Sequence, residues 1–267
     1  LGSGGCIFCS AGGSGDFAAS RELSITEQIE SQIAQLSAKR PIEKYIAYFQ
    51  AYTNTYAPVS YLENIFTEAI RHPAVVALSI GTRPDCLGED VIALLSRLNR
   101  QKPVWIELGL QTMHESTASY IRRGYALPCF EKAVAALRRE HIEVIVHTIL
   151  GLPSETRQDI LATMQYLNGQ DIQGIKLQLL HVLRGTDLAE DYLKNRFSVY
   201  TKEEYLDILT ACLEHLRPDL VIHRVTGDGP KNLLIAPLWA SRKREVLNSL
   251  HHTMKERGAY QGRLYQP

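Results

Sequence analysis

Short apolar runs rich in β-branched residues alternate with amphipathic helical patterns, at steps of about 30 residues. This alternation is typical of βαβ units, in which a helix joins successive parallel strands. It predicts an α/β protein built as a partial (β/α)6-type barrel, with a doubly wound sheet as the alternative. The expected strands span residues 45–49, 75–80, 104–108, 142–146, 175–180 and 220–225, and the expected helices span residues 59–71, 89–99, 115–122, 130–139, 155–167, 188–194 and 202–216.

Two of the expected helices begin at a hydroxyl residue. Ser154 and Thr201 are expected N-caps, because a hydroxyl oxygen can accept a hydrogen bond from a free backbone N–H of the first turn. Glu204, three residues after Thr201, would complete a capping box. We expect residues 1–200 to form the partial barrel and residues 201–267 to form an α/β extension that completes or covers it.

Polar residues follow almost every expected strand, where a purely structural barrel would not need them. In both candidate folds, active residues gather where strands end and helices begin. The function is therefore expected at the carboxyl ends of the strands. The segments concerned are FQAYTNTY (49–56), IGTRPDC (80–86), ELGLQT (107–112), HTILGLPSET (147–156) and LHVLRGT (180–186).

Composition limits the possible classes of protein. The 267 residues contain 29 Lys plus Arg against 29 Asp plus Glu, so the net charge argues neither for nor against a nucleic-acid partner. The longest apolar runs have the length of strands, far short of a membrane span, so no membrane association is expected. Five cysteines, two of them in a C-x-x-C pair, favour reduced thiols in a cytoplasmic enzyme.

The pair Cys6 and Cys9 lies in a glycine-rich segment near the start of the chain. Thiolates at this spacing can bind one metal ion or one cluster together. A zinc site would need two more Cys or His at short spacing, and a thioredoxin-type dithiol would open a helix directly after a strand. Neither pattern is present, whereas an iron–sulfur cluster with three cysteine ligands would need only one further cysteine.

With the strand-end segments added, the chain resembles radical S-adenosylmethionine (SAM) enzymes. More closely it resembles the bacterial family often called YtqA/YhcC, whose radical domain is similar to that of the Elongator catalytic subunit. The resemblance extends over essentially the whole chain. It implies a [4Fe–4S] cluster that binds SAM and cleaves it to methionine and a 5′-deoxyadenosyl radical. Further segments that carry it are GGCIFCSAGGSGDFA (4–18), IRRGY (121–125), KLQLLHVLRGT (176–186) and HRVTGDGPKNLLIAPLW (223–239).

In this family Cys6 and Cys9 would be two of three cluster ligands, and the third would lie upstream of the pair. We therefore expect the third cysteine before Leu1, with the first strand, and expect the chain to be a fragment or an ordered core. The remaining cysteines are poor substitutes: Cys86 follows a separate strand, Cys129 precedes a helix and Cys212 has the pattern of a buried helical residue.

The resemblance also implies roles for residues at the strand ends. Asn54 and its neighbours would meet the methionine amino group of SAM, Gln111 the ribose hydroxyls, and Arg123 the carboxylate, which its guanidinium fork fits. Residues expected to face the substrate are Arg83, Asp85 and Arg184. The full set of expected SAM contacts is Gln50, Thr53, Asn54, Glu107, Gln111, Arg123, His147, His181 and Val182.

The substrate that the resemblance implies is the wobble uridine of tRNA, with conversion of its carboxymethylaminomethyl substituent to aminomethyl. The other expected partners are an electron donor such as flavodoxin or ferredoxin, and a tRNA methyltransferase that acts on the product. The basic segment 217–257 is either a solvated helix face or a surface for a polyanion, to which Trp239 and Tyr260 could add stacking.

Three alternatives remain open from the residues alone. The first is a radical SAM enzyme that acts on a small molecule. The second is a β/α-barrel enzyme without iron, in which Gly12–Gly15 cradles a phosphate. The third is a binding module that keeps the barrel and has no cluster.

Overall fold

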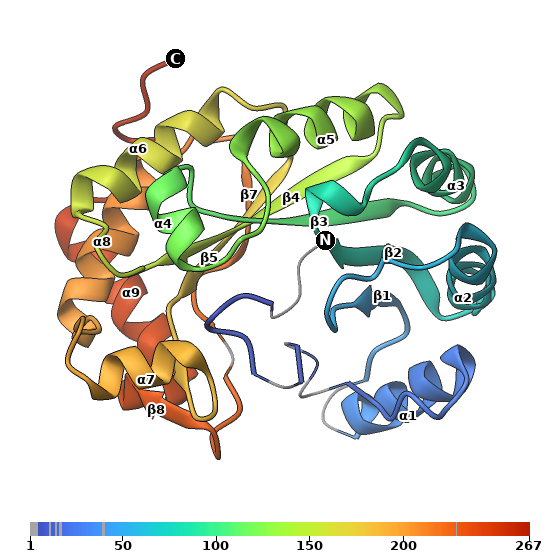
Figure 1. Cartoon of the computed structure of the whole chain (residues 1–267), viewed down its shortest axis with the longest axis horizontal. Helices are drawn as coiled ribbons and strands as arrows, with labels where there is room; N and C mark the ends of the chain where they lie inside the picture. The colour runs from blue at the N-terminus through green and yellow to red at the C-terminus, as the bar shows by residue number, and fades with distance from the viewer. Residues whose placement is uncertain (1–4, 11, 14, 16–17, 39–40, 228) are drawn as a thin grey trace. The chain divides into compact units, whose positions relative to one another are not determined.

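A computed structural model describes residues 5–10, 12–13, 15, 18–38, 41–227 and 229–267. Six strands form one sheet in the order β1-β2-β3-β4-β5-β7 (Figure 1). The pairs β1–β2, β2–β3 and β5–β7 are parallel, so the expected α/β fold of partial-barrel type is confirmed. The strands are β1 Tyr45–Phe49, β2 Val75–Thr82, β3 Val104–Gln111, β4 Glu143–Leu150, β5 Gly174–Leu179 and β7 Val221–Arg224.

Helices alternate with these strands as the sequence predicts. The expected helices are α2 Val59–Arg71, α3 Glu89–Asn99, α4 Glu115–Tyr120, α5 Leu127–Arg139, α6 Arg157–Asn168, α7 Asp187–Leu193 and α8 Lys202–His215. Elements beyond the prediction are α1 Ile25–Ser37, α9 Lys243–Arg257, the short helices η1 Pro84–Cys86 and η2 Leu238–Ser241, and the antiparallel pair β6 Val182–Leu183 with β8 Leu234–Ala236. Among the described residues, no helix has the length and apolar character needed to cross a membrane.

The chain divides into two compact units, and the division passes through β3 and β4. We call residues 12–109 and 128–145 the α1–α3 unit, and residues 1–11, 110–127 and 146–267 the α6–α9 unit. The division that the sequence suggests, at residue 200, stays a prediction.

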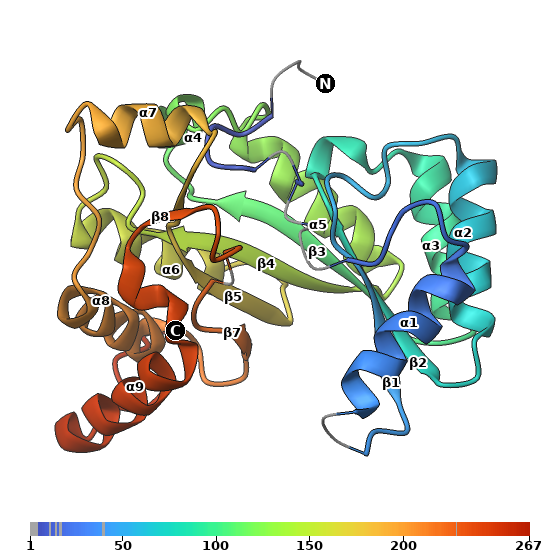
Figure 2. The ribbon, with the colours of Figure 1, turned by 90° about the horizontal axis from the view of Figure 1, so that it is seen from below.

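The core of the α1–α3 unit forms where α2 packs on β2 and α3 (Figure 2). Phe66 is fully buried, and its ring meets Phe49 of β1 edge to face at 5.0 Å between centroids. Leu62 and Ile70, one turn before and after Phe66, extend the same buried stripe. Through Phe66, helix α2 therefore packs against β1, the edge strand of the sheet.

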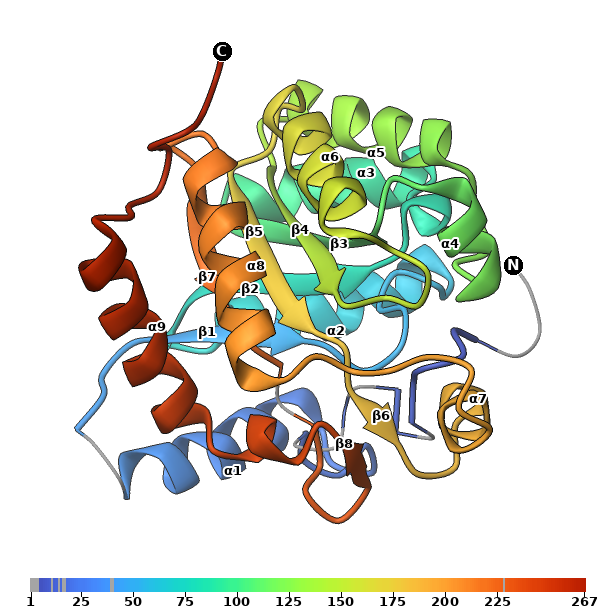
Figure 3. The same cartoon turned by 90° about the vertical axis from the view of Figure 1, so that its left-hand side faces the viewer.

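In the α6–α9 unit, α8 packs against both α6 and α9 (Figure 3). Tyr205 of α8 is fully buried, and its hydroxyl donates a hydrogen bond to the carbonyl of Val225 at 2.7 Å. Trp239 lies beside the Tyr205 ring, at 5.6 Å between centroids, and its indole N–H donates to the carbonyl of Tyr200. Trp239 thus packs within the protein and differs from the stacking surface expected from the sequence.

The structure confirms one predicted cap and corrects the other. Thr201 and Glu204 form the expected capping box at the start of α8. Ser154 is not an N-cap: its φ is +70°, and α6 begins at Arg157, with Thr156 as its N-cap in a capping box with Asp159. Ser154 and Thr156 both carry a hydroxyl group, so the residue type does not tell which of them caps α6. The backbone conformation of the turn after Pro153 decides it.

Two matched substitutions test how far a cap stabilises the whole fold. Thr201→Ala should lower the free energy of unfolding by about 1 kcal/mol, because α8 contributes buried side chains along most of its length. Ser24→Ala removes the same kind of capping box from α1, which buries no residue, so it should fray α1 and change global stability little. Urea denaturation with hydrogen exchange measures both effects. Equal losses of global stability would contradict this account.

Candidate functional site

Cys6 and Cys9 form a tight turn in the α6–α9 unit. The N–H of Cys9 donates to the carbonyl of Cys6 at 3.2 Å, and the Cys6 thiol donates weakly to the carbonyl of Arg122 at 3.8 Å. A hydrogen bond with the Cys6 thiol, together with burial, raises the pKa of the Cys9 thiol. The two thiols therefore lie within reach of one another, and a metal or cluster bound there would replace their protons.

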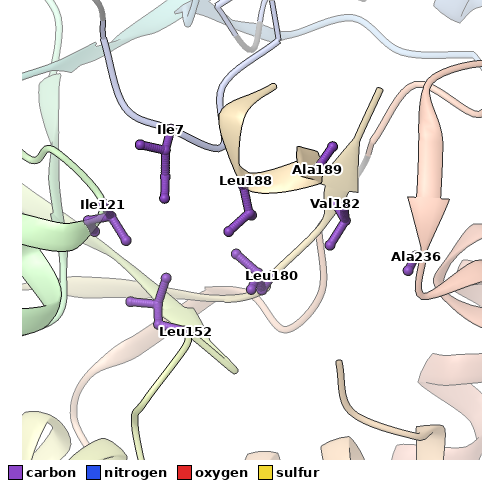
Figure 4. Packing of buried hydrophobic residues seen from close by; sticks show 8 residues of the cluster. All are labelled: Ile7, Ile121, Leu152, Leu180, Val182, Leu188, Ala189 and Ala236. Atoms are coloured by element: carbon purple, nitrogen blue, oxygen red, sulfur yellow. The ribbon is translucent and has the colours of Figure 1, made fainter. Parts of the chain in front are cut away.

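Ile7 anchors this turn. Its side chain is 5% exposed and packs in a cluster with Ile121, Leu152, Leu180 and Leu188 (Figure 4). Its backbone is also held on both sides: its N–H donates to the carbonyl of Ile121 at 3.3 Å, and its carbonyl accepts from the N–H of Leu188 at 3.0 Å. The turn that carries the thiols is thus fixed to the end of α4 and the start of α7.

The two thiols fit part of the ligand set of a three-cysteine cluster. Within the described parts of the chain, no group of three Cys, His, Asp or Glu is placed to hold a metal ion. Cys86, Cys129 and Cys212 lie on η1, α5 and α8, and Cys212 is fully buried. The expected third cysteine before Leu1 lies outside the described residues and stays a prediction.

Gln111, at the end of β3, has an unusual backbone. Its φ is +66°, and the N–H of Thr112 donates to the carbonyl of Leu110 at 2.9 Å, so Gln111 is the central residue of a γ-turn with positive φ. Its side-chain oxygen Oε1 is buried and has no hydrogen-bond partner among the described residues. A buried carbonyl oxygen without a donor is costly, so this atom fits a ligand that brings an N–H or O–H group.

Arg123 is buried, and its guanidinium is hydrogen-bonded within the α6–α9 unit. It is 2% exposed, and its guanidinium donates to the carbonyls of Tyr125 at 3.0 Å and Thr112 at 2.7 Å. A longer bond of 3.4 Å reaches the carbonyl of Leu110, and Nη2 pairs with the Glu115 carboxylate at 3.0 Å. In the described structure the guanidinium is therefore engaged by the protein itself, and no fork is presented to a cofactor carboxylate.

The expected contacts on later strands of the α6–α9 unit have different environments. His147 of β4 is half-buried, and its Nδ1 lies 3.1 Å from the side-chain nitrogen of Gln178 on β5. Val182 is fully buried in the cluster around Ile7, so its side chain is a core residue, and its expected contact with SAM stays a prediction. Arg184, expected to face the substrate, is exposed. Its backbone N–H donates a hydrogen bond to the carbonyl of Leu233, which links the end of β6 to the segment before β8.

His181 is enclosed by glycines. A Cβ added at Gly227 would lie 2.7 Å from the imidazole ring, and one added at Gly229 would lie 3.0 Å from it. The segment after β7 can therefore approach the ring only because it lacks side chains at these two positions. The role of His181 toward SAM stays a prediction.

In the α1–α3 unit, Asn54 ties two strand ends together. Its side-chain nitrogen donates to the carbonyls of Phe49 at 3.0 Å and Gly81 at 2.9 Å, at the ends of β1 and β2. Gln50 and Asn54 also line a groove of about 410 Å3 between α1 and β1. Thr53 is half-buried nearby in sequence, and its proposed contact with the methionine amino group stays a prediction.

Glu107 is a buried carboxylate held by two neighbouring strands. It is 4% exposed, and it accepts hydrogen bonds from the hydroxyls of Tyr48 at 2.8 Å and Ser79 at 2.6 Å. Arg83 and Asp85, expected to face the substrate, pair with each other through two hydrogen bonds of 2.9 and 2.7 Å. Their charges thus offset one another within the α1–α3 unit.

Sequence reasoning missed Ile7, Tyr48, Ser79 and Glu155. The signal for Ile7 was an apolar residue inside an otherwise small and polar loop. Tyr48 and Ser79 each lie one position before a polar segment, and both have the pattern of ordinary strand residues. Glu155 has its pKa raised by burial, an effect that hydrogen bonds from the hydroxyls of Thr112 and Thr117 oppose.

Two of the glycines expected to cradle a phosphate pack closely against neighbouring side chains, and the phosphate alternative stays untested. A Cβ at Gly13 would lie 2.5 Å from the Tyr52 ring, and one at Gly15 would lie 2.6 Å from the Ala51 side chain. The N–H of Gly15 already donates to the carbonyl of Gly12 at 2.8 Å. Ser14, within the same segment, lies outside the described residues.

Some cations of the basic segment 217–257 pair with acidic side chains. Arg217 pairs with Asp219, Arg242 with Glu245, and Arg257 with Asp207. The choice between a solvated helix face and a polyanion surface stays a prediction. Tyr260 is 62% exposed, in contrast to Trp239.

Comparison with known proteins agrees with this geometry. Residues 3–167 match the radical SAM superfamily, and residues 172–256 match the radical SAM C-terminal domain. The chain is 43% identical to the uncharacterized protein YtqA of Bacillus subtilis, over 98% of the chain and 82% of YtqA. It is 32% identical to the protein YhcC of Escherichia coli, over 100% of the chain and 85% of YhcC.

More distant similarities are also present. A tRNA uridine(34) acetyltransferase of Methanocaldococcus jannaschii is 26% identical over 64% of the chain, which covers 32% of that protein. The structure of the archaeal Methanocaldococcus infernus Elp3 with an N-terminal deletion is 18% identical, with a TM-score of 0.76, and the match covers 90% of this chain and 61% of that chain. At this identity the structural match shows the shared fold.

Substitution of Ile7 tests the anchor of the two thiols. Ile7→Ala should lower the free energy of unfolding by about 3 kcal/mol, and in the folded protein without metal it should speed alkylation of Cys6 and Cys9, because the turn loses its buried attachment. Ile172→Ala is the matched control, since Ile172 is fully buried in the same unit and outside the Ile7 cluster. Unchanged alkylation in Ile7→Ala would show that the turn is held by other contacts.

The buried carboxyl of Glu155 makes a prediction about pH. The pKa of Glu155 is raised in the folded protein, so the unfolded chain releases this proton at a lower pH than the folded one does. The folded state therefore loses stability as the pH rises above the usual pKa of a glutamate, because the buried carboxyl must then ionise. Glu155→Gln should therefore raise the melting temperature at pH 8 and change it little at pH 4. The exposed Glu43 gives the control Glu43→Gln. A gain that is larger at pH 4 would contradict the sign.

Proposed function

Since the chain belongs to the radical SAM superfamily, and within it to the family of YtqA and YhcC, we propose that it modifies the wobble uridine of tRNA with a [4Fe–4S] cluster and SAM. That it is a radical SAM enzyme follows from the family. The tRNA substrate and the reaction are the part that we propose.

One observation carries the cofactor assignment to this chain: Cys6 and Cys9 lie in one tight turn that the buried Ile7 holds in place. Cys6 and Cys9 would hold two irons of the cluster. When bound, the cluster supplies the electron that cleaves SAM to methionine and a 5′-deoxyadenosyl radical. A fixed turn suits this task because redox sites depend on stable ligand positions and on hydrogen bonds to the sulfur atoms.

The residues of this chain would bind and orient SAM. The free Oε1 of Gln111 would accept a hydrogen bond from a ribose hydroxyl, which removes the cost of leaving that oxygen unpaired. His147, half-buried on β4, would add a second polar contact to the sugar. The close approach of the chain at Gly151, where φ is +88°, would let backbone meet the adenine.

The substrate class is supported by the distant similarity to a tRNA uridine(34) acetyltransferase, which by its name acts on the same nucleoside. Within this class we propose oxidation of carboxymethylaminomethyluridine at the methylene carbon of its carboxymethyl group, with SAM as the two-electron oxidant. Water then hydrolyses the resulting imine, which releases the two carbons as glyoxylate and leaves aminomethyluridine for a methyltransferase. Abstraction of a hydrogen atom from this methylene carbon is a reaction that a 5′-deoxyadenosyl radical can perform, so the chemistry suits the cofactor.

The cofactor is tested by reconstitution of the full-length protein with iron and sulfide under anaerobic conditions. The intact protein should gain the visible absorbance of thiolate-ligated iron and form 5′-deoxyadenosine from SAM when reduced. Cys9→Ala should abolish both, whereas Cys129→Ala, on α5 and outside the Cys6–Cys9 turn, should retain them. Cluster formation in Cys9→Ala at the level of the intact protein would overturn the assignment.

The substrate is tested by mass spectrometry of tRNA nucleosides from cells with and without the gene. Cells without it should accumulate carboxymethylaminomethyluridine and lose its descendants, and the Cys129→Ala gene should restore the profile while the Cys9→Ala gene should not. An unchanged wobble-uridine profile, together with SAM cleavage by the purified protein, would leave a radical SAM enzyme with a different substrate.

A further inference from the structure

The backbone at Gln111 adopts a conformation that an L-residue with a side chain rarely adopts. The chain makes a γ-turn there with φ of +66°, closed by the bond of 2.9 Å from the Thr112 N–H to the Leu110 carbonyl. Such strained turns persist only where the surroundings hold them, and they cluster at functional sites. The strain at Gln111 therefore calls for a group that holds it.

Arg123 is that group. Its Nη1 donates to the carbonyls of Leu110 and Thr112, the residues directly before and after Gln111, at 3.4 and 2.7 Å. The guanidinium is fixed in turn by the Tyr125 carbonyl and the Glu115 carboxylate, and it lies over the Tyr125 ring at 4.7 Å from the centroid. The guanidinium thus hydrogen-bonds to the backbone on both sides of Gln111, an arrangement that we call the bracket.

The direction of the Gln111 side chain indicates a function for the bracket. Its Oε1 is buried and, among the residues that the structure describes, has no donor. A relaxed backbone would turn the side chain to another direction, because φ decides where the Cβ points. The positive φ of Gln111 and the direction of its Oε1 therefore result from the same backbone conformation, which the Arg123 guanidinium stabilises.

We infer that Arg123 is a positioning residue, which holds the γ-turn so that the Gln111 oxygen meets a hydroxyl donor of the adenosine part of SAM. The competing role is direct binding of the SAM carboxylate by Arg123. Burial of the guanidinium to 2% exposure and its pairing with Glu115 argue against that role. The inference rests on the proposed cofactor, and it names the residue that prepares one contact to it.

Two probes separate the roles, because 5′-methylthioadenosine has the adenosine part of SAM and lacks the carboxylate. In the reconstituted full-length protein, Arg123→Ala should weaken binding of both probes by a similar factor of about ten, the loss of one buried hydrogen bond. Arg123→Lys should weaken both as well, since a single ammonium does not bracket two carbonyls. The control Arg122→Ala removes an exposed arginine paired with Asp187 and should change neither.

Loss of SAM binding with unchanged binding of 5′-methylthioadenosine, and partial recovery in Arg123→Lys, would show a carboxylate ligand and overturn the inference. The effect on 5′-methylthioadenosine should also vanish in a Gln111→Ala background, because the contact that Arg123 prepares is then absent. A full effect of Arg123→Ala in that background would equally contradict it.

A measurement without cofactor keeps the inference distinct from the proposed function. Glycine adopts positive φ freely, so in a Gln111→Gly background Arg123→Lys should cost less melting temperature than in the intact protein. If neither probe binds the intact protein but this coupling is found, the cofactor assignment fails and the bracket stands. If the melting temperatures add without coupling, the bracket itself is wrong.

Discussion

The packing of one aliphatic side chain decides where the two thiols lie. Cys6 and Cys9 belong to a loop without regular structure, and a loop of small and polar residues has little of its own to hold it. Burial of Ile7 among residues of α4, α7 and the β4–α6 segment supplies that hold, and the backbone bonds to Ile121 and Leu188 set its orientation. The chemistry at the sulfur atoms therefore depends on hydrophobic contacts made by the residue between them.

Much of the fold could be predicted because apolar periodicity reports which faces are buried. The bounds of α2, α3 and β1 agree with the sequence expectation. Strands β2, β3 and β4 run two to four residues further than expected, since the ladder of backbone hydrogen bonds continues after the apolar run ends. Helix α1 was missed although its apolar residues Ile25, Ile29, Ile33 and Leu36 have helical spacing, so the sequence does carry a signal for it even though the helix buries no residue.

The site was predicted in part, for reasons that differ between residues. Gln111 was found from its motif, and its strained turn and unfilled oxygen agree with a binding role. Arg123 was found from its spacing, but spacing does not tell whether a guanidinium meets a ligand or the protein's own carbonyls. The side chain of Val182 packs in the core, which the sequence did not indicate, because the residues at a strand end follow the same pattern whether a side chain faces a ligand or the core. Such choices depend on side-chain direction, which no local pattern records.

Asn54 carries a consequence for how sequences of this kind are compared. Its amide donates to two carbonyl oxygens at the ends of neighbouring strands. An aspartate has nearly the same shape and counts as a mild replacement in any table of similarity. Here it would set a negative charge against two carbonyl dipoles and turn two attractions into repulsions. Spontaneous loss of the amide nitrogen, a common form of chemical ageing, would thus part the strand ends at the rim of the sheet without any change in the gene.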